Sequence, residues 1–172
     1  LARRSDRFCQ FALAAAQQAV KDSNIEGNVD SSRLGVYVGS GIGGINTFVN
    51  ECTKMNEEGA NRVSPLFIPM LISNIAAGNI AISHKAEGPC LPVVTACATS
   101  THAIGEAYRA IKHGYADAII AGGAEATITP LAVGGFMNSK ALSKSTDPLR
   151  ASLPFDAERG GFVMGEGAGI VI

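Results

Sequence analysis

Cys97 stands where a run of apolar, partly β-branched residues gives way to an Ala-rich helical pattern, within the stretch TACATS at 95–100. The first N–H groups of a helix have no partner inside it and the helix dipole is positive there, and both favour a thiolate over a thiol. The small neighbours leave room for a substrate carbonyl, and the same N–H groups could hold an oxyanion. The position therefore suits a nucleophile that becomes acylated, with a small buried core residue as the alternative interpretation.

A cysteine nucleophile commonly works with a nearby histidine, and the chain has three. His102 follows Cys97 on the same predicted helix, at a rotation of about 140°, so we expect it to point away from the face that the cysteine uses. His113 lies near the end of that helix, where a cation is favoured for structural reasons, and His84 also ends a helical pattern. None of the three is a convincing partner, and we expect the acid or base to come from outside these residues.

The glycine-rich stretch GSGIGG, at 39–44, fits the pattern GxGxxG between a predicted strand and a predicted helix. That pattern indicates a dinucleotide site when a second strand ends in Asp or Glu about 20 residues further on. The corresponding region here, ANRVSPLFIP at 60–69, is predicted to be a loop. The stretch by itself therefore favours a tight turn between closely packed backbones over a nucleotide site.

A second glycine-rich stretch, PFDAERGGFVMGEGAG, occupies 154–169. Asp156 and Arg159 could form an ion pair in the loop before a strand, and the glycines permit close packing or bulges within that strand. From its residues alone we interpret this stretch as structural.

The elements that must position these residues alternate between helix and strand. Helices are predicted at 6–23, 45–57, 69–84 and 98–113, strands at 33–39, 88–96, 116–126 and 160–172, and a short helix with loops over 130–153. The strands are apolar on both faces, which is typical of an α/β fold whose mainly parallel sheet is covered by helices on both faces. The sequence shows no repeat and no linker that would divide it.

Length, charge and cysteine spacing exclude several classes of function. The chain has 172 residues, is 47% hydrophobic and carries a net charge of −1, so nothing points to nucleic acid or to an anionic membrane surface. No apolar run predicts a membrane span, and no signal peptide is seen. The four cysteines match no zinc-binding spacing, so we predict no metal site and a reducing, cytoplasmic protein with free thiols.

Six stretches together resemble the β-ketoacyl-acyl carrier protein synthases, specifically the KAS II type of bacterial fatty acid synthesis. They are GSGIGG (39–44), SPLFIP (64–69), GPCLPVVTACATS (88–100), AIIAGGAEATITPLAVGGF (118–136), ALS (141–143) and PFDAERGGFVMGEGAGIVI (154–172). Their order and spacing agree over essentially the whole chain. The resemblance implies a thiolase-like fold, in which 1–172 form part of the N-terminal synthase domain. It also fits a chain that begins without Met and stops within a strand pattern, as a segment of a longer protein that lacks the C-terminal half.

The resemblance implies roles for four residues. Cys97 matches the nucleophile that accepts the acyl group from acyl carrier protein, and its backbone N–H matches one oxyanion donor. Ile42 matches a residue that lines the acyl pocket, and Phe136 matches another near that pocket and its entrance. Phe67 matches a residue that reaches the acyl channel of a partner subunit.

The activity implied is that of an acyltransferase, 3-oxoacyl-[acyl-carrier-protein] synthase. An acyl-Cys97 intermediate would be attacked by the carbanion from decarboxylated malonyl-acyl carrier protein, which extends the acyl chain by two carbons. No cofactor is implied, because the phosphopantetheine arm arrives on the carrier protein. The family's two histidines, lysine and second oxyanion donor belong to the C-terminal half. We therefore predict that residues 1–172 alone neither complete the condensation nor fold independently.

Two kinds of protein contact are implied in the same way. The segment around 90–95 resembles the strand that pairs across the two-fold axis of a homodimer. Four basic residues resemble positions on the face that docks the acidic carrier protein: Arg3, Arg4, Arg62 and Lys140. Surface Lys and Arg are usually only solvated, which is the simpler interpretation of these four.

Three other functions stay open at this point. A polyketide ketosynthase is the nearest, although Ile42 and the stretch TACATS favour fatty acid elongation. A non-catalytic partner subunit like the chain-length factors is the second, and Cys97 argues against it because those subunits typically lack the nucleophile. The third is a nucleotide-binding oxidoreductase resting on 39–44, which a titration with NAD(P)H would test.

Overall fold

The computed structural model describes residues 4–172, which divide into two compact units. One unit comprises the described residues up to Ala126 together with Gly167–Ile172, and the other is Thr127–Glu166. This division was not predicted. The chain passes from a strand of the first unit straight into the second unit and returns straight into another strand, so no linker composition marks either boundary.

The first unit is a three-stranded sheet flanked by helices. Its elements are α1 (Arg7–Ser23), β1 (Leu34–Gly39), α2 (Ile45–Glu58), α3 (Phe67–Leu71), α4 (Ile75–Ser83), α5 (Thr99–Lys112), β2 (Ala118–Glu125) and β3 (Gly167–Val171). Short 3-10 turns are η2 (Ser31–Arg33), η3 (Ala60–Arg62) and η4 (Ala96–Ala98). The strand order is β1-β2-β3, with β1 parallel and β3 antiparallel to β2. The predicted α/β class is confirmed, with one parallel and one antiparallel strand pair.

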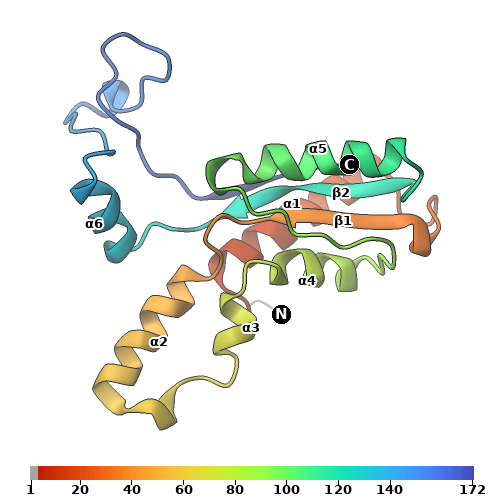
Figure 1. Ribbon diagram of the computed structural model, residues 1–172, viewed down its shortest axis with the longest axis horizontal. Coiled ribbons are helices and arrows are strands. Elements are labelled where there is room, and N and C mark those ends of the chain that lie inside the picture. The colour runs from red at the N-terminus through yellow and green to blue at the C-terminus, as the bar shows by residue number, and fades with distance from the viewer. Residues whose placement is uncertain (1–3) are drawn as a thin grey trace. The chain divides into compact units, whose positions relative to one another are not determined.

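Helices cover both faces of this sheet: α1 and α4 lie on one side and α5 on the other (Figure 1). On α1 the buried side chains are Phe8, Cys9, Ala12, Ala16 and Val20, a spacing that places them along one helical stripe. They form the larger core with α4 and the strands. All six residues of β1 are buried, as a strand covered on both faces requires.

The other face of the sheet is covered by alanines. Ala107 and Ala110 of α5 form a second core with Tyr37, Ile119 and Ala121 of the strands, together with Ala116. Side chains this small let the helix backbone approach the sheet closely, and at the first turn of α5 a Cβ on Gly123 would lie 2.2 Å from Ser100 Oγ. The sheet therefore holds the N-terminal end of α5, where Cys97 lies, against the carboxyl ends of β1 and β2.

The predicted strand at 88–96 is wrong. The segment runs beside β1 but makes a single bridge, between Cys90 and Val36, through the bonds Val36 N–H to Pro89 O (2.9 Å) and Leu91 N–H to Val36 O (3.1 Å). Pro89 and Pro92 have no N–H to donate, so a regular ladder cannot extend through the segment. The apolar run predicted extended backbone correctly, and the prolines prevent its pairing.

The predicted helix at 69–84 is two helices. α3 begins at Phe67, and Pro69 sits inside its first turn, where the missing proline N–H is not needed. Ile72 then adopts extended angles (φ −63°, ψ 135°) and separates α3 from α4. The interruption brings the end of α3 onto the turn after β1, because Gly44 N–H donates to Leu71 O at 2.9 Å.

The second unit contains α6 (Pro130–Asn138) and the 3-10 turn η5 (Pro148–Arg150). The predicted strand at 160–172 is shorter, Gly167–Val171, because Phe162 pairs within the second unit instead, in a bridge to Leu142. The predicted ion pair between Asp156 and Arg159 is also wrong: the guanidinium donates to the backbone carbonyl of Asp156 at 2.8 Å.

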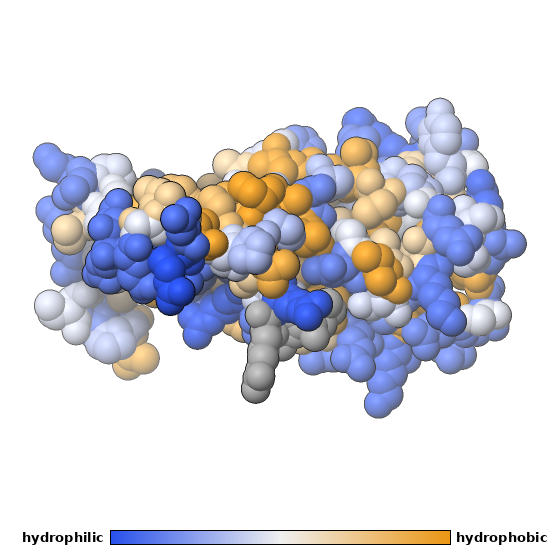
Figure 2. Space-filling view, turned by 90° about the horizontal axis from the view of Figure 1, so that it is seen from below, coloured by the Kyte–Doolittle hydropathy of each residue, from blue (hydrophilic) through white to orange (hydrophobic). Residues whose placement is uncertain are grey.

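Figure 2 shows apolar side chains gathered on the face that carries α3 and α4. Ile68 of α3 and Ile82 of α4 are 57% and 78% exposed, and Ile72, Leu91 and Val94 are also exposed. An exposed apolar face of this kind marks a surface that another protein segment covers. Within residues 4–172, no helix combines the length and the apolar character needed to cross a bilayer.

Candidate active site

Cys97 lies in η4, immediately before α5, as a free and exposed thiol. α5 begins at Thr99, with Ala98 at its N-cap position. No side chain of the described residues caps this helix end, and its first turn contains no acidic residue. The positive end of the α5 dipole therefore lies next to the residue that carries the thiol, and the first turn holds no acidic side chain, although the Thr99 N–H itself donates to Ala96 O.

The turn that carries Cys97 is held by one buried hydroxyl. Thr99 Oγ1 accepts from Thr95 N–H at 2.9 Å and donates to Ala96 O at 2.7 Å, so it ties together the two residues before the cysteine. Ala96 has a φ of +51°, a left-handed conformation that costs a non-glycine residue about 1–2 kcal/mol. The hydrogen bonds of Thr99 oppose that strain and keep the turn in the shape that exposes Cys97.

The three histidines make other contacts. His102 Nδ1 lies 2.8 Å from Thr95 Oγ1, so its ring supports the start of the turn. His84 Nδ1 lies 3.3 Å from a carboxylate oxygen of Glu26, and His113 is the C-cap of α5. That the acid or base comes from outside these residues stays a prediction.

The glycine-rich turn after β1 is organised by Glu125, the last residue of β2. One carboxylate oxygen accepts from Ser40 Oγ at 2.9 Å. The other accepts from the backbone N–H of Gly41 at 2.8 Å and of Ile42 at 3.2 Å. Ser40 Oγ in turn accepts from Gly43 N–H at 2.9 Å, so this one network holds four consecutive residues of the turn.

The hydrogen bonds of Glu125 argue against a nucleotide-binding site in the Gly39–Gly44 turn. In a dinucleotide site the N–H groups of the glycine-rich turn bind a pyrophosphate. Here the N–H groups of Gly41 and Ile42 donate to the carboxylate of Glu125, and a phosphate placed there would meet a negative charge. The match to GxGxxG thus reflects a turn filled by the protein's own carboxylate.

Glycines let the two turns approach one another. A Cβ on Gly39 would lie 2.1 Å from Val93 O and 2.5 Å from Thr99 Cγ2, so β1 can end beside the Cys97 turn only with glycine at this position. A Cβ on Gly41 would lie 2.7 Å from the Glu125 carboxylate and 3.5 Å from Ala96 O. Gly41 therefore packs close to the backbone of Ala96, and Ile42 is the next residue along the chain.

The structure places Ile42 close to the Cys97 turn and Phe67 on a helix that contacts the turn after β1. Ile42 is exposed in the turn beside Ala96. Phe67 is half-buried at the start of α3, the helix whose last residue, Leu71, accepts a hydrogen bond from Gly44. Phe136 belongs to the second unit, where its ring packs edge-on against Phe162 with centroids 5.2 Å apart.

The four predicted docking residues are described only in part. Arg3 lies outside the described residues, and Arg4 is exposed. Arg62 Nε donates to Glu58 at 3.0 Å, so its charge is partly neutralised. Lys140, in the second unit, is exposed just after α6.

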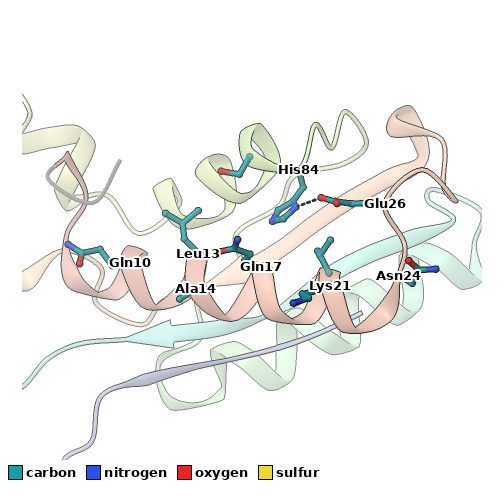
Figure 3. A pocket seen from close by; sticks show the side chains of 10 residues that line it. Gln10, Leu13, Ala14, Gln17, Lys21, Asn24, Glu26 and His84 are labelled. Atoms are coloured by element: carbon teal, nitrogen blue, oxygen red, sulfur yellow. Dashed lines mark hydrogen bonds and ion pairs between the residues drawn. The ribbon is translucent and has the colours of Figure 1, made fainter.

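A separate cavity of about 750 Å³ lies between α1, α4 and the loop after α1 (Figure 3). Gln10, Gln17 and Lys21 line it from α1, and His84 and Glu26, whose Nδ1 and Oε1 lie 3.3 Å apart, line another side. Cys97 does not line it. Within residues 4–172, no three His, Cys, Asp or Glu side chains are grouped as metal ligands.

Sequence reasoning missed three residues that position the site: Glu125, Thr99 and Asp6. Asp6 is buried, and one of its oxygens accepts from Thr47 N–H at 2.7 Å and from Thr47 Oγ1 at 2.6 Å, which fixes the first turn of α2. The only signal for Glu125 was an acidic residue at the end of a buried strand. Asp6 occupies the N-cap position of α1, and its side chain caps no N–H there but reaches α2.

A cysteine exposed on a strained turn, at the uncapped N-terminus of a helix on an α/β sheet, is in a position that suits a nucleophile. The chain belongs to the β-ketoacyl synthase family: residues 1–172 match the model of the family's N-terminal domain. A 3-oxoacyl-[acyl-carrier-protein] synthase 2 from Synechocystis is 49% identical over 99% of this chain, and one from Staphylococcus aureus is 50% identical over the same share. The chain spans 42% and 43% of the lengths of these relatives.

Solved structures agree with this assignment. A β-ketoacyl synthase from Burkholderia phymatum is 31% identical, with a TM-score of 0.86 over 98% of this chain and 42% of its own. A type II PKS ketosynthase, bound to the hexaketide and in complex with its acyl-carrier protein, is 31% identical with a TM-score of 0.88, over 95% and 42% of the two chains. The predicted thiolase-like ketosynthase fold is confirmed.

Proposed function

We propose that this chain is the nucleophile-bearing part of a β-ketoacyl-acyl carrier protein synthase that elongates fatty acyl chains, with Cys97 as the acyl acceptor. The observation that carries the proposal is the exposed Cys97 thiol at the uncapped N-terminus of α5. Sequence similarity supports the proposal as well, because the chain is 49–50% identical to two proteins named 3-oxoacyl-[acyl-carrier-protein] synthase 2.

In the first step the thiolate of Cys97 attacks the carbonyl carbon of an acyl thioester carried on the phosphopantetheine arm. A carbon–sulfur bond forms, and the backbone N–H of Cys97 donates to the oxyanion. When the tetrahedral intermediate collapses, the bond to the carrier sulfur breaks and the phosphopantetheine thiolate leaves, taking up the proton that Cys97 gave away. The carrier protein departs with a free thiol, and the acyl group stays on Cys97.

In the second step malonyl-acyl carrier protein loses its carboxylate as carbon dioxide, and the electron pair of the broken bond becomes a carbanion. The carbanion attacks the carbonyl of acyl-Cys97, a carbon–carbon bond forms, and the Cys97 thiolate is expelled. The residues that polarise the malonyl thioester belong to the remaining part of a complete synthase. This region supplies the nucleophile, one oxyanion donor and part of the acyl pocket, and no bound cofactor enters either step.

Contacts within a complete synthase follow from the same proposal. Ile42 and Phe136 line the acyl pocket, and Phe67 reaches the channel of a second copy. Formation of a homodimer is supported by the exposed apolar residues of α3, α4 and the 90–95 segment. Arg3, Arg4, Arg62 and Lys140 would meet the acidic carrier protein, a partner seen with the related ketosynthase. The free thiols suit a cytoplasmic, reducing location.

Polyketide synthesis is the second candidate, because one related structure is a type II PKS ketosynthase. Its identity to this chain is 31%, against 49–50% for the fatty acid type synthases. That difference favours fatty acid elongation. The products of a complete synthase distinguish the two functions. Use of a saturated acyl primer, with release of the β-ketoacyl product after one extension, supports fatty acid elongation. Repeated extension of an unreduced chain supports the polyketide alternative.

Intact-mass measurement tests the proposal directly. A complete synthase containing these residues is incubated with a medium-chain acyl-acyl carrier protein, in the wild type, Cys97→Ala and Cys90→Ala. Cys90 is the matched control because it is also an exposed free thiol. We expect one acyl adduct on the wild type and on Cys90→Ala, and none on Cys97→Ala. An adduct that survives Cys97→Ala, or no adduct on a folded wild type, contradicts the proposal.

A further inference from the structure

The carboxylate of Glu125 contacts the Gly39–Gly44 turn more extensively than any other side chain of the described residues. It accepts from Ser40 Oγ (2.9 Å), Gly41 N–H (2.8 Å) and Ile42 N–H (3.2 Å). Hydrogen bonds to an ionised acceptor are about twice as strong as those between neutral groups. Because two of the three donors are backbone groups, the carboxylate fixes the path of the chain through the turn.

The turn also packs against the Cys97 segment. A Cβ on Gly41 would lie 2.7 Å from the Glu125 carboxylate and 3.5 Å from Ala96 O, so the carboxylate and the backbone before Cys97 both lie close to Gly41. Ser40 is 1% exposed and bonds both Glu125 and Gly43 N–H. The turn can therefore move away from Cys97 only if its bonds to Glu125 are broken.

Ile42 is the residue whose position these contacts decide. Its N–H is held by Glu125, while its side chain is 45% exposed and makes no part of either core. The backbone of Ile42 is thus anchored and its side chain projects from the anchor. If the backbone of Ile42 cannot move, its apolar side chain forms a wall at a fixed position, and that wall limits how far an apolar ligand can extend.

We propose that Glu125 is a positioning residue that sets how far Ile42 reaches toward the thiol of Cys97, and thereby which acyl chain lengths the site accepts. This rests on the proposed function, since it requires that acyl groups occupy the space beside Cys97. Glu125 touches neither the acyl chain nor the thiol in this proposal; it acts through the Ser40–Ile42 backbone. A site discriminates between homologous chains when its wall holds one position, because each misplaced methylene changes the relative rates by about 10-fold or more.

A merely structural role makes a different prediction. If Glu125 only stabilised the fold, its loss would lower the amount of folded enzyme or slow all acyl chains by the same factor. If it positions Ile42, its loss changes the ratio of rates between chain lengths. The ratio is therefore the measurement that distinguishes the two roles.

The experiment uses a complete synthase containing these residues, as wild type, Glu125→Gln, Ser40→Ala and Glu87→Gln. Glu87 is the matched control: its carboxylate also accepts from a serine hydroxyl, Ser31 Oγ at 3.2 Å, but before the start of β1. The rate of acylation, as kcat/KM, is measured for medium-chain and long-chain acyl-acyl carrier proteins. We expect the long-to-medium ratio to change by about tenfold in Glu125→Gln, less in Ser40→Ala, and not in Glu87→Gln.

A double-mutant cycle with Ile42→Ala identifies the path of the effect. Once the Ile42 side chain is removed, Glu125→Gln has nothing to reposition, so the two changes together should give the ratio of Ile42→Ala alone. An effect of Glu125→Gln that is equal in both backgrounds, or equal for all chain lengths, overturns the positioning role. If Glu125→Gln does not fold, Ser40→Ala carries the same test, because it leaves the carboxylate and removes one of its donors.

The two proposals fail in different ways. A folded wild type that takes no acyl group on Cys97 overturns the proposed function and this inference with it. A wild type that is acylated normally, with an unchanged length ratio in Glu125→Gln and Ser40→Ala, overturns only the role of Glu125.

Discussion

The two turns at the carboxyl end of the sheet differ in what their backbone N–H groups bind. In the Gly39–Gly44 turn before α2, N–H groups donate to the carboxylate of Glu125, and Asp6 binds the first turn of α2. In the Thr95–Ala98 turn before α5, the Thr95 N–H donates to the uncharged hydroxyl of Thr99, which in turn donates to Ala96 O. Both turns lead into a helix N-terminus, and both are built from small residues. The protein neutralises one helix end with its own carboxylates and leaves the other uncapped beside a thiol.

This difference separates a turn whose N–H groups are held by a carboxylate from the turn that carries the proposed nucleophile. Sequence pattern alone favours a tight turn over a nucleotide site at 39–44, and in the structure the N–H groups of Gly41 and Ile42 donate to Glu125. An N-terminal helix end binds a substrate anion only where no side chain has reached it first. The following predictions test this comparison, starting with the largest effect.

Gly39→Ala should disrupt the contact between the two turns. The added Cβ would lie 2.1 Å from Val93 O and 2.5 Å from Thr99 Cγ2. Because Val93 O is a backbone atom, it cannot move away without a shift of the chain. We therefore expect the free energy of unfolding to fall by about 3 kcal/mol. The control is Gly105→Ala on α5, where a Cβ meets nothing within 4 Å and alanine should stabilise the helix by up to about 1 kcal/mol. Denaturant unfolding of a complete synthase measures both. Equal stabilities would show that the turns are not in close contact.

Thr99→Val should loosen the reactive turn alone. The substitution keeps the shape but removes the hydroxyl that bonds Thr95 N–H and Ala96 O, which we expect to destabilise the protein by about 1–3 kcal/mol. Acylation of Cys97 should slow as well, because the turn no longer holds one position. Thr101→Val, at an exposed position of the same helix, is the control. Acylation that stays at the wild-type rate in Thr99→Val would show that the turn needs no such bracing.

Ala96→Gly should relieve strain in the same turn. Glycine adopts a φ of +51° without the penalty that alanine pays, but it loses more entropy on folding, so we expect a net stabilisation of about 0.5–1 kcal/mol. Ala14→Gly, at an exposed position inside α1, should instead destabilise by about 0.5–1 kcal/mol. The two variants are compared by their denaturation midpoints. Stabilities that change in the same direction would contradict strain at Ala96.

The smallest predicted effect concerns the ion pair of Arg33 with Asp117, which lies where β1 and β2 begin. Hydrogen bonds from Arg33 lower the pKa of Asp117 below its usual range. A lowered folded-state pKa means that this pair stabilises the protein above the usual Asp pKa of about 3.9, and that the contribution is lost as the pH falls through the lower, folded-state value. Both side chains are exposed, so the effect should be small and weaken with salt.

Arg33→Ala should remove that acid-dependent contribution, seen as a flatter dependence of stability on pH in the acid range. Arg109→Ala is the control, since Arg109 pairs with Glu106 within one helix. A pH dependence in Arg33→Ala that matches the wild type would show that the pair contributes nothing. This carboxylate is bound by a side chain in solvent, whereas Glu125 binds backbone within the fold, and their effects should differ accordingly.

Local sequence pattern predicted most of the helices and strands. The helix predicted at 6–23 is observed as α1, Arg7–Ser23, and the strand predicted at 33–39 is observed as β1, Leu34–Gly39. The prediction failed at 88–96, where the prolines prevent strand pairing despite an apolar pattern. It also failed at 160–166, where Phe162 pairs within the second unit. Apolar pattern indicates extended backbone, but the pairing partner depends on residues distant in sequence.

The sequence by itself predicted a candidate nucleophile, Cys97, and indicated the family that the comparisons confirm. A cysteine among small residues at a strand-to-helix joint is a local arrangement, and the hydrogen-bonding and dipole of a helix end follow from its backbone alone. Only the tertiary structure decided which of the two glycine- and alanine-rich turns is unoccupied. Glu125 is about 80 residues from the turn that it holds, and Asp6 is 41 from Thr47, because the sheet and α1 bring them there. Such contacts are set by packing between distant segments, which no local pattern records.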